Sequence, residues 1–486
     1  MSAPAAPDGA SSPMKILLIA MPDTVSSLAA VMRIPNLGIC SLAGSLEGCT
    51  VHCLDLSFAR GRITPLLECT LADLAPDMVG ISAMSFQFES ARRVAGICRR
   101  ARPGMPIALG GYHATLLAEE IAASSDRELF DFIVRGEGEA VLALLVKQIG
   151  SGSGSYGAIP GLSYLGNGGF VHNPAGKLLD LDSVRLPDRD ARILDSSRFM
   201  KMPFDCVETS RGCTMGCTFC SIRRMYGKSV RFFPLERVLE DLRRLKSRGT
   251  RGVFFVDDNI TLDVPRLKEL CQRIAREGLA SLYYVIQASV PGIASNPELP
   301  ALLAKAGFRW VFLGIESGIA RNLAQMRKSG QLAHTRTAVE RLRAHGICAI
   351  GGFIAGNPDD TREDIRDTYR YARDLHLDHA IVQVLTPYPK TETREHLLAE
   401  GLVTNPDDFS RYNGFISNVR TRHLSQRELN RWVVLYGARL YFDPRFFLAS
   451  RVWWYQPADA PAMFLNNFRF LFDGLRGRLF ASTHRW

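Results

Sequence analysis

Short apolar runs alternate with amphipathic segments over the first third of the chain. Residues 15–20, "KILLIA", are almost entirely apolar, as is typical of a buried strand, whereas residues 89–101 carry apolar side chains at helical spacing. Apolar runs of this kind occur at residues 15–20, 51–56, 78–84, 107–111 and 131–139. Short buried strands separated by helices indicate a parallel sheet covered on both faces. Residues 14–150 are therefore predicted to form a doubly wound domain, which would bind ligands at the carboxyl ends of its strands.

The alternation of predicted strands and helices stops after residue 150 and resumes after residue 200 with a longer period. Residues 151–200 are rich in glycine and serine and are predicted to form a linker that contains a small hairpin. Within residues 201–400, strands are predicted at residues 205–210, 252–259, 282–289, 310–317, 348–356 and 380–389. Six strand–helix units of this length indicate a partial (β/α)6 barrel or a complete barrel. We expect the loops that follow these strands to converge on one site.

The two ends of the chain differ in composition from these α/β units. Residues 1–13 are small and proline-rich and are predicted to be a disordered tail. Residues 401–486 hold 18 of the 44 aromatic residues and twelve arginines, but no lysine. We predict a mostly helical C-terminal unit there. Its core would cover the open end of the barrel, and a segment within residues 440–486 could instead lie on a membrane surface as an interfacial helix.

Overall composition narrows the class of protein further. At 486 residues the chain is too long for one core, and its 47% hydrophobic content is enough for several. It has neither a secretory signal nor an apolar run of about 18 residues, so we expect a cytoplasmic protein. Eleven cysteines in such a chain argue against a disulfide scaffold. The net charge of +10 allows an anionic partner but does not identify one.

Three of the cysteines, Cys213, Cys217 and Cys220, lie close together in "CTMGCTFC". Coincidence is one explanation, and structural zinc is another, although zinc usually takes four ligands and no second cysteine pair lies nearby. The third explanation is an iron–sulfur cluster, whose thiolate ligands normally number four. Three ligands would leave one iron open to a substrate or cofactor. This last explanation is the one we favour.

The CxxxCxxC spacing, on a loop after the first barrel strand, resembles that of the radical S-adenosylmethionine (SAM) enzymes. "FFVDDN", "FLGIESG", "GGFIAGNPDDT" and "LTPYPKTE" resemble further barrel segments of that family. The resemblance implies a [4Fe–4S] cluster on the three cysteines, with SAM bound at the open iron. It also implies SAM-binding residues, namely Phe219 beside the adenine, Asp257 or Asp258 at the methionyl amine, Gln287, Glu316 at the ribose or methionyl group, Gly352 and Pro387. Strand-end capping or an ion pair is the alternative for the carboxylates, and a core-edge amide for Gln287.

The N-terminal domain resembles the cobalamin-binding class within this family. The resemblance rests on "SAM" at residues 82–84, a glycine pair at 110–111 with 25 residues between, "IPNLG" at 34–38 and "RGEGE" at 135–139. It implies cobalamin contacts from Asn36, Gly38, Ser82, Met84, Gly110, Gly111, Gly136 and Glu137. Pro22 and Asp55 are added as cobalamin contacts because they follow predicted strands of the same sheet. The Asp-x-His-x-x-Gly motif that ligates cobalt in other cobalamin proteins is absent. We therefore expect cobalamin without a histidine axial ligand; a scaffold domain that has lost the cofactor is the alternative.

The resemblance implies a cobalamin-dependent radical SAM enzyme that methylates an unactivated carbon of a small or lipid-like substrate. A 5′-deoxyadenosyl radical would remove a hydrogen atom, and methylcobalamin would supply the methyl group. One alternative is a cyclase, ring-rearranging or oxidising enzyme of the same family, and another is a metal-stabilised nucleic-acid-binding module. The cluster would need a flavodoxin- or ferredoxin-type electron donor, which we expect near Arg223, Arg224 and Lys228. Nucleic acid is not expected as a partner, because no recognised module accompanies the basic charge.

Overall fold

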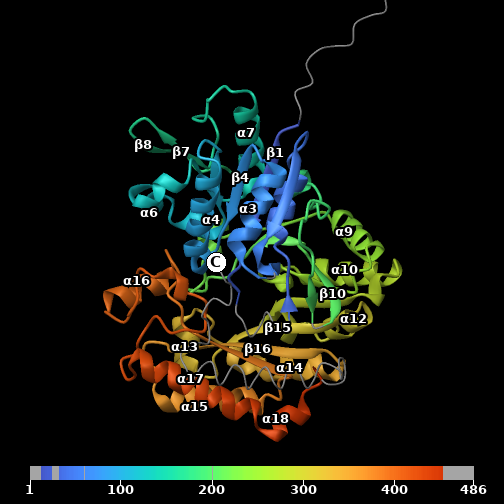
Figure 1. Ribbon diagram of the computed structural model, residues 1–486. Helices are drawn as coiled ribbons and strands as arrows, with labels where there is room; N and C mark the ends of the chain where they lie inside the picture. The colour runs from blue at the N-terminus through green and yellow to red at the C-terminus, as the bar shows by residue number, and fades with distance from the viewer. Residues whose placement is uncertain (1–12, 25–31, 60, 200, 453–485) are drawn as a thin grey trace, which may run out of the picture.

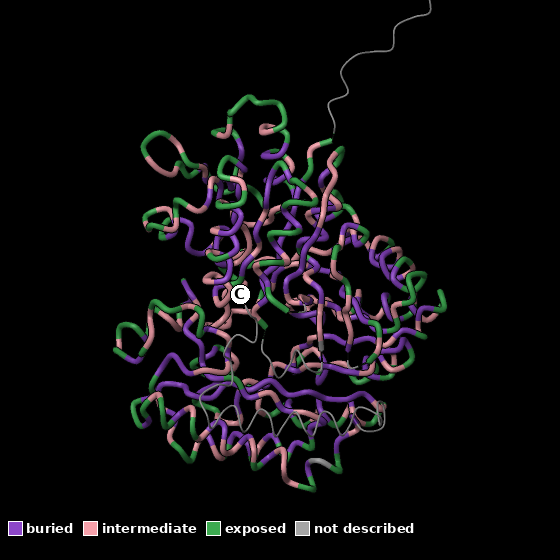
Figure 2. Tube along the Cα trace, viewed as in Figure 1, coloured by how far each residue is buried: buried purple, intermediate pink, exposed green. Residues whose placement is uncertain are grey.

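A computed structural model describes residues 13–24, 32–59, 61–199, 201–452 and 486. Two sheets stand one above the other in Figure 1, and helices line their outer faces. The upper sheet belongs to the N-terminal part of the chain, and the lower one is strongly curved. Figure 2 shows that the central strands of both sheets are buried, while the loops at the rim are exposed.

The N-terminal sheet has the predicted doubly wound architecture. Five parallel strands lie in the order β3-β1-β4-β5-β6, with bounds β1 Lys15–Ala20, β3 Thr50–Asp55, β4 Met78–Ser82, β5 Ile107–Gly110 and β6 Phe132–Val134. Successive residues of β1 point to opposite faces, as in any strand. Leu17 and Ile19 pack with α3 (Ile63–Leu74) and α4 (Phe88–Ala101). Ile16 and Leu18 pack on the other face with α2 (Leu37–Gly44) and α7 (Gly138–Gly150). Two short helices, α5 Tyr112–Leu116 and α6 Ala118–Ala123, follow β5.

The hairpin predicted within residues 151–200 consists of β7 (Leu162–Gly166) and β8 (Gly169–His172). It does not stand apart from the first domain, since β7 pairs antiparallel with β6 and extends the same sheet. This part of the chain therefore completes the N-terminal sheet before it leads to the second unit.

The second sheet is the predicted partial barrel. Its six parallel strands are β10 Met202–Val207, β13 Gly252–Phe255, β14 Tyr283–Ser289, β15 Phe308–Glu316, β16 Cys348–Ala355 and β17 His379–Val384. The helices after these strands are α9 Leu235–Ser247, α10 Val264–Arg276, α11 Val290–Ala294, α12 Leu299–Lys305, α13 Ala320–Gln325, α14 Gln331–Ala344, α15 Arg362–Asp374 and α16 Glu392–Ala399. Amphipathic faces, such as Val238, Leu239 and Leu242 of α9, bury this helical layer against the strands.

Two short strands that the sequence did not predict widen the barrel sheet. β9 (Arg198–Phe199) pairs antiparallel with β10, and β2 (Met32–Arg33) pairs with β9. β2 belongs to the chain between β1 and α2 of the N-terminal domain, so this domain contributes an edge strand to the barrel. Strands of two residues carry no periodic pattern, which explains why neither was predicted.

The C-terminal unit packs on the outside of the barrel. α17 (Gln426–Tyr441) lies against α15, where the Tyr369 hydroxyl donates to the Val433 carbonyl over 2.8 Å, and α18 (Pro444–Ala449) follows. Most of the aromatic segment predicted to cover the open end of the barrel or to lie on a membrane surface lies outside the described residues. Within the described residues, no helix combines the length and the apolar character needed to cross a bilayer.

Candidate active site

The three predicted cysteine ligands lie together on a loop at the carboxyl edge of the barrel. This loop, residues 213–220, is named the thiol loop here; it leaves β11 (Ser210–Gly212) and leads into α8 (Ile222–Tyr226). Cys213, Cys217 and Cys220 are half-buried free thiols that line one cavity of about 360 Å³, the thiol cavity. Burial raises the pKa of each thiol, and that of Cys220 reaches about 12. A positively charged ligand such as iron would offset this penalty by stabilising the thiolates.

The two adjacent aspartates, Asp257 and Asp258, have different surroundings. Asp257 is 1% exposed and accepts hydrogen bonds from the Thr209 amide (3.1 Å) and the Thr209 hydroxyl (2.7 Å). Asp258 lines the thiol cavity and accepts from the Gly212 amide over 3.1 Å, directly before Cys213. Desolvation raises the pKa of each carboxyl group to about 6. Asp257 thus holds the backbone before the thiol loop, and Asp258 is the aspartate that faces the cavity.

Glu316 reaches the thiol cavity through an uncommon backbone conformation. Its φ is +63°, and its carboxylate pairs with the Lys328 ammonium over 2.6 Å. The Lys328 side chain is only 9% exposed. Burial opposes the charge of Lys328, but the attraction of Glu316 and of Cys217 outweighs it and raises the pKa of the ammonium group. Lys328 was not predicted, because a single lysine in a loop gives no sequence signal.

The other predicted SAM-binding residues divide into two groups. Phe219, Gln287 and Gly352 line the thiol cavity. A Cβ at Gly352 would lie 2.4 Å from the Phe312 ring, so only glycine lets that ring pack here. Pro387 is not among the lining residues; its neighbours Leu385, Thr386 and Tyr388 are.

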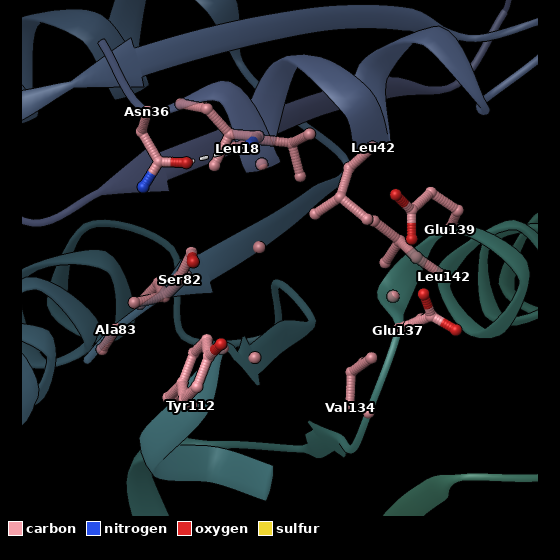
Figure 3. Close-up of a pocket in the computed structure, with 18 of the residues that line it drawn as sticks. Leu18, Asn36, Leu42, Ser82, Ala83, Tyr112, Val134, Glu137, Glu139 and Leu142 are labelled. Carbon is pink, nitrogen blue, oxygen red and sulfur yellow. Dashed lines mark hydrogen bonds between the residues drawn. The ribbon is translucent and has the colours of Figure 1, made fainter. Parts of the chain in front are cut away.

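A second cavity of about 300 Å³ lies at the carboxyl edge of the N-terminal sheet, where it faces the barrel. Figure 3 shows its wall, with Asn36, Ser82 and Tyr112 on one side and Glu137 and Glu139 on the other. We name it the glycine cavity because six glycines line it: Gly38, Gly80, Gly110, Gly111, Gly136 and Gly138. Of the predicted cobalamin contacts, eight line it, namely Asn36, Gly38, Ser82, Met84, Gly110, Gly111, Gly136 and Glu137.

Two predicted cobalamin contacts, Pro22 and Asp55, do not line the glycine cavity. Asp55 is buried and accepts from the Asn36 amide over 2.8 Å, and the Asn36 side chain in turn caps α2 by accepting from the Ile39 amide over 3.1 Å. Asp55 therefore acts on the cavity through Asn36. Sequence position after a strand does not distinguish a residue that lines a cavity from one that holds its neighbour in place.

Several residues of the glycine cavity were not predicted, and some come from the barrel unit. Tyr112 and Glu139 belong to the N-terminal domain, whereas Arg211, Met225 and Tyr226 surround the thiol loop. Burial raises the pKa of Tyr112 well above its ordinary value, and the neighbouring Tyr226 raises it further. Only tertiary structure brings these residues together. α8 separates the two cavities, since Ile222 lines the thiol cavity while Met225 and Tyr226 line the glycine cavity.

Neither His52 nor His113 of the N-terminal domain lines the glycine cavity. His113 is 2% exposed and stacks on Phe88 with ring centroids 4.0 Å apart, and His52 is in β3.

Gly111 has a φ of +92°, and a Cβ there would lie 2.7 Å from the Ala83 carbonyl oxygen. Glycines at such positions leave bare backbone along the cavity, which suits close approach by a large cofactor.

The donor sets of the two cavities fit the cofactors that the sequence implied. Three thiols on one short loop suit an iron–sulfur cluster with one open iron, and Asp258, Glu316 and Lys328 offer charges to the amino-acid part of SAM. A glycine-lined cavity on a doubly wound sheet suits the nucleotide tail of cobalamin. Fold and site together define the class of radical enzymes that combine a [4Fe–4S] cluster with cobalamin.

Comparisons with known proteins agree with this class. The radical SAM superfamily matches residues 207–372, and the B12 binding domain family matches residues 27–146. An uncharacterized methyltransferase of Pyrococcus horikoshii is 30% identical over 90% of this chain and 94% of its own length. The hopanoid C-3 methylase of Methylococcus capsulatus is 33% identical over 59% of this chain and 53% of its own length. The anaerobic magnesium-protoporphyrin IX monomethyl ester cyclase of Rubrivivax gelatinosus is 28% identical over 71% of this chain and 62% of its own length.

A solved structure shows the same fold. The cobalamin-dependent SAM radical enzyme OxsB superimposes with a TM-score of 0.69 at 18% identity, over 93% of this chain and 72% of that one. The chain belongs to the cobalamin-dependent radical SAM family. It is an enzyme whose cofactors are a [4Fe–4S] cluster, SAM and cobalamin.

Proposed function

We propose that this enzyme methylates an unactivated carbon of an apolar substrate. The observation that carries the proposal is the position of α8, which has the thiol cavity on one side and the glycine cavity on the other. When bound, the cofactors supply a 5′-deoxyadenosyl radical, which removes hydrogen from carbon, and a methyl group to replace it. Relatives with methylase or methyltransferase in their names favour this outcome.

The protein's own residues orient the reactants. Cys213, Cys217 and Cys220 would hold the cluster, and Asp258, Glu316 and Lys328 would hold the charged methionyl group beside it. Phe219, Gln287 and Gly352 would contact the rest of SAM. The eight residues of the glycine cavity named above would contact cobalamin. In this account the protein contributes mainly geometry, because a radical reaction depends on which carbon lies within reach.

The interior of the barrel supports an apolar substrate. Residues two apart on a strand share a face, so Trp310 and Phe312 of β15 and Ile350 of β16 point into the barrel below Gly314 and Gly352, which line the thiol cavity. These side chains belong to an apolar cluster with Val285, and Phe312 itself lines the thiol cavity. An apolar wall next to the radical would exclude water and favour a lipid-like or tetrapyrrole substrate.

Cyclisation or oxidation without methyl transfer is the second candidate function, because the cyclase relative matches 71% of this chain. The products distinguish the two. Protein reconstituted without oxygen and given cobalamin, SAM and a reductant is analysed for nucleosides by mass spectrometry. Methylation predicts adenosylhomocysteine together with 5′-deoxyadenosine. If 5′-deoxyadenosine formed without adenosylhomocysteine, the methylation proposal would be wrong and cyclisation or oxidation would replace it.

We infer that the electron donor is an acidic protein of the flavodoxin or ferredoxin type. Arg223, Arg224 and Lys228 are exposed on or next to α8, immediately after the last cluster cysteine. Arg223 lies 3.7 Å from Glu392, and no ion pair is recorded for the other two among the described residues. Opposite charge on the donor would steer it to this edge of the thiol loop.

A further inference from the structure

Glu137, predicted as a cobalamin contact, is held on both sides by arginines of the barrel unit. It follows β6 and its side chain is 4% exposed. One carboxylate oxygen accepts from Arg211 over 3.1 Å and from Arg231 over 3.0 Å. The other accepts from Arg231 over 2.9 Å and from the Leu179 amide over 2.7 Å. Both oxygens are therefore engaged by protein donors, although Glu137 lines the glycine cavity.

Arg211 extends this contact into a buried network. It donates to Glu139 over 2.7 Å and to Glu208 over 2.8 Å, and its side chain is 10% exposed. Glu139 also accepts from the Ser41 hydroxyl of α2 over 2.8 Å. Burial opposes the charge of Arg211, but the surrounding carboxylates outweigh it and raise the pKa of the guanidinium group. The network thus joins α2 and the start of α7 to the barrel unit.

The two arginines occupy paired positions at the base of the thiol loop. β11 carries Arg211 and pairs antiparallel with β12 (Val230–Phe232), which carries Arg231 opposite it. Everything between these two strands, residues 213–229, is the thiol loop, α8 and the segment that follows. The Glu137 carboxylate of the N-terminal domain therefore binds both β11 and β12, the two strands that flank residues 213–229.

We propose that Glu137, together with Arg211 and Arg231, is a positioning clamp that fixes the thiol loop on the N-terminal domain and so sets the separation between cluster and cobalamin. The proposal rests on the two cofactors that the family implies. Radical and methyl group must reach the same carbon, and a misplacement of about 1 Å can cost about 100-fold in rate. The clamp would add a buried, charged contact to the short β2–β9 pairing that also joins the two domains, and relative domain motion is the default unless the interface is large.

Three variants test the clamp in the full chain. Glu137→Gln removes the charge with little change in size, and Arg231→Gln weakens the clamp at a residue that does not line the glycine cavity. Lys390→Gln is the matched control, since Lys390 also bridges to the N-terminal domain, through Glu120, with side chains 46% and 49% exposed. Iron, sulfide and cobalamin contents are measured first. Wild-type protein that failed to take up either cofactor would refute the proposed function and not the clamp.

Two readouts then report position without turnover. In protein reduced with dithionite, the cluster and cob(II)alamin are both paramagnetic, so the relaxation of the cobalamin EPR signal reports their separation. Hydrogen exchange of residues 213–229 reports how firmly the loop is held. We expect Glu137→Gln and Arg231→Gln to change the relaxation and to speed exchange about tenfold or more, as loss of a buried charge partner implies. Lys390→Gln should match wild type, because exposed pairs contribute little.

The clamp is overturned if Arg231→Gln keeps both cofactors and leaves relaxation and exchange as in wild type. The same result for Glu137→Gln would overturn it too. If Glu137→Gln misfolds or loses cobalamin, Arg231→Gln alone decides, because it leaves the cavity wall intact. A purely structural role would alter exchange but not the relaxation of the cobalamin signal in cofactor-loaded protein, and that outcome also counts against the clamp.

Discussion

Replacing Gly111 by alanine should weaken cobalamin binding selectively. The residue has a φ of +92° in the wall of the glycine cavity, and an added Cβ would meet three atoms of the Ala83 backbone, its carbonyl oxygen at 2.7 Å and its amide nitrogen at 2.9 Å. Ala83 cannot swing aside as a flexible side chain could, because its amide donates to the Gly110 carbonyl and its carbonyl accepts from the His113 amide. The substitution must therefore displace the backbone that lines the cavity.

Two costs add to give the magnitude. A residue with a Cβ at φ +92° and ψ −170° costs roughly 1–3 kcal/mol, and forcing atoms into packed structure costs about 1–3 kcal/mol. The sum is about 2–6 kcal/mol, and the loop after β4 can escape part of it by moving into the cavity. Cobalamin would have to reverse that movement. We therefore expect the dissociation constant for cobalamin to rise about 30-fold or more, since each 1.4 kcal/mol is about tenfold.

Gly48→Ala is the matched control for this prediction. Gly48 has a φ of +70°, nothing lies within 4 Å of a Cβ there, and it is not a lining residue of the glycine cavity. Gly48→Ala should carry only the conformational cost, so we expect this variant to bind cobalamin with wild-type affinity. The assay is equilibrium dialysis of the chain against cobalamin, followed by absorbance, with iron content as a check on the thiol loop. Equal affinity of Gly111→Ala and wild type, or equal losses in both variants, would refute the steric argument.

Three further predictions follow from the site. Serine at any of the three cluster cysteines should remove most iron and sulfide and abolish 5′-deoxyadenosine formation, as elemental analysis and mass spectrometry would reveal; retained turnover would contradict the cluster assignment. Because folded Asp257 and Asp258 have pKa values of about 6 against an ordinary 3.8, the folded apoprotein binds protons more tightly than the unfolded chain. Their contribution to stability should fall as pH rises from about 4 to about 6, by roughly 3 kcal/mol per carboxyl group. The difference in urea midpoint between wild type and Asp257→Asn should therefore change over this interval, and a difference that stays constant with pH would contradict the prediction. Neutralising Arg223, Arg224 and Lys228 should slow cluster reduction by flavodoxin but not by dithionite, and equal rates with flavodoxin would exclude this docking surface.

The local pattern of apolar residues was sufficient to predict the two sheets but not the contacts between the domains that contain them. Each buried strand of the two sheets could be predicted because a parallel strand covered on both faces must be apolar along its length, as "KILLIA" is. The thiol loop could be predicted because cluster ligation imposes a spacing within a few residues. β2 could not be predicted, since its partner β9 lies far away in sequence and two residues carry no period.

Residues that act across the domain boundary were missed for the same reason. Tyr226 and Arg211 line a cavity of the other domain only after folding, and Lys328 pairs with Glu316 across the intervening helix α13. Glu137 was noticed, but its glycine-flanked loop suggested a cofactor contact. Its arginine partners lie 74 and 94 residues further along the chain, so sequence proximity gave no indication of the pairing.

The sequence predicted that one aspartate of the pair after β13 faces SAM, but it did not predict which of the two. Side chains of adjacent residues in extended backbone point in opposite directions, so one of Asp257 and Asp258 had to enter the fold if the other faced the cavity. The sequence could not say which, because the choice depends on where β13 stops pairing with its neighbours. The Val256 amide still donates to the Val207 carbonyl, and Asp257 then turns inward to receive the Thr209 amide and hydroxyl. Asp258 is thereby left to face the thiol cavity. Asp257→Asn should consequently disturb the thiol loop through β11, whereas Asp258→Asn should leave the loop in place and weaken SAM binding.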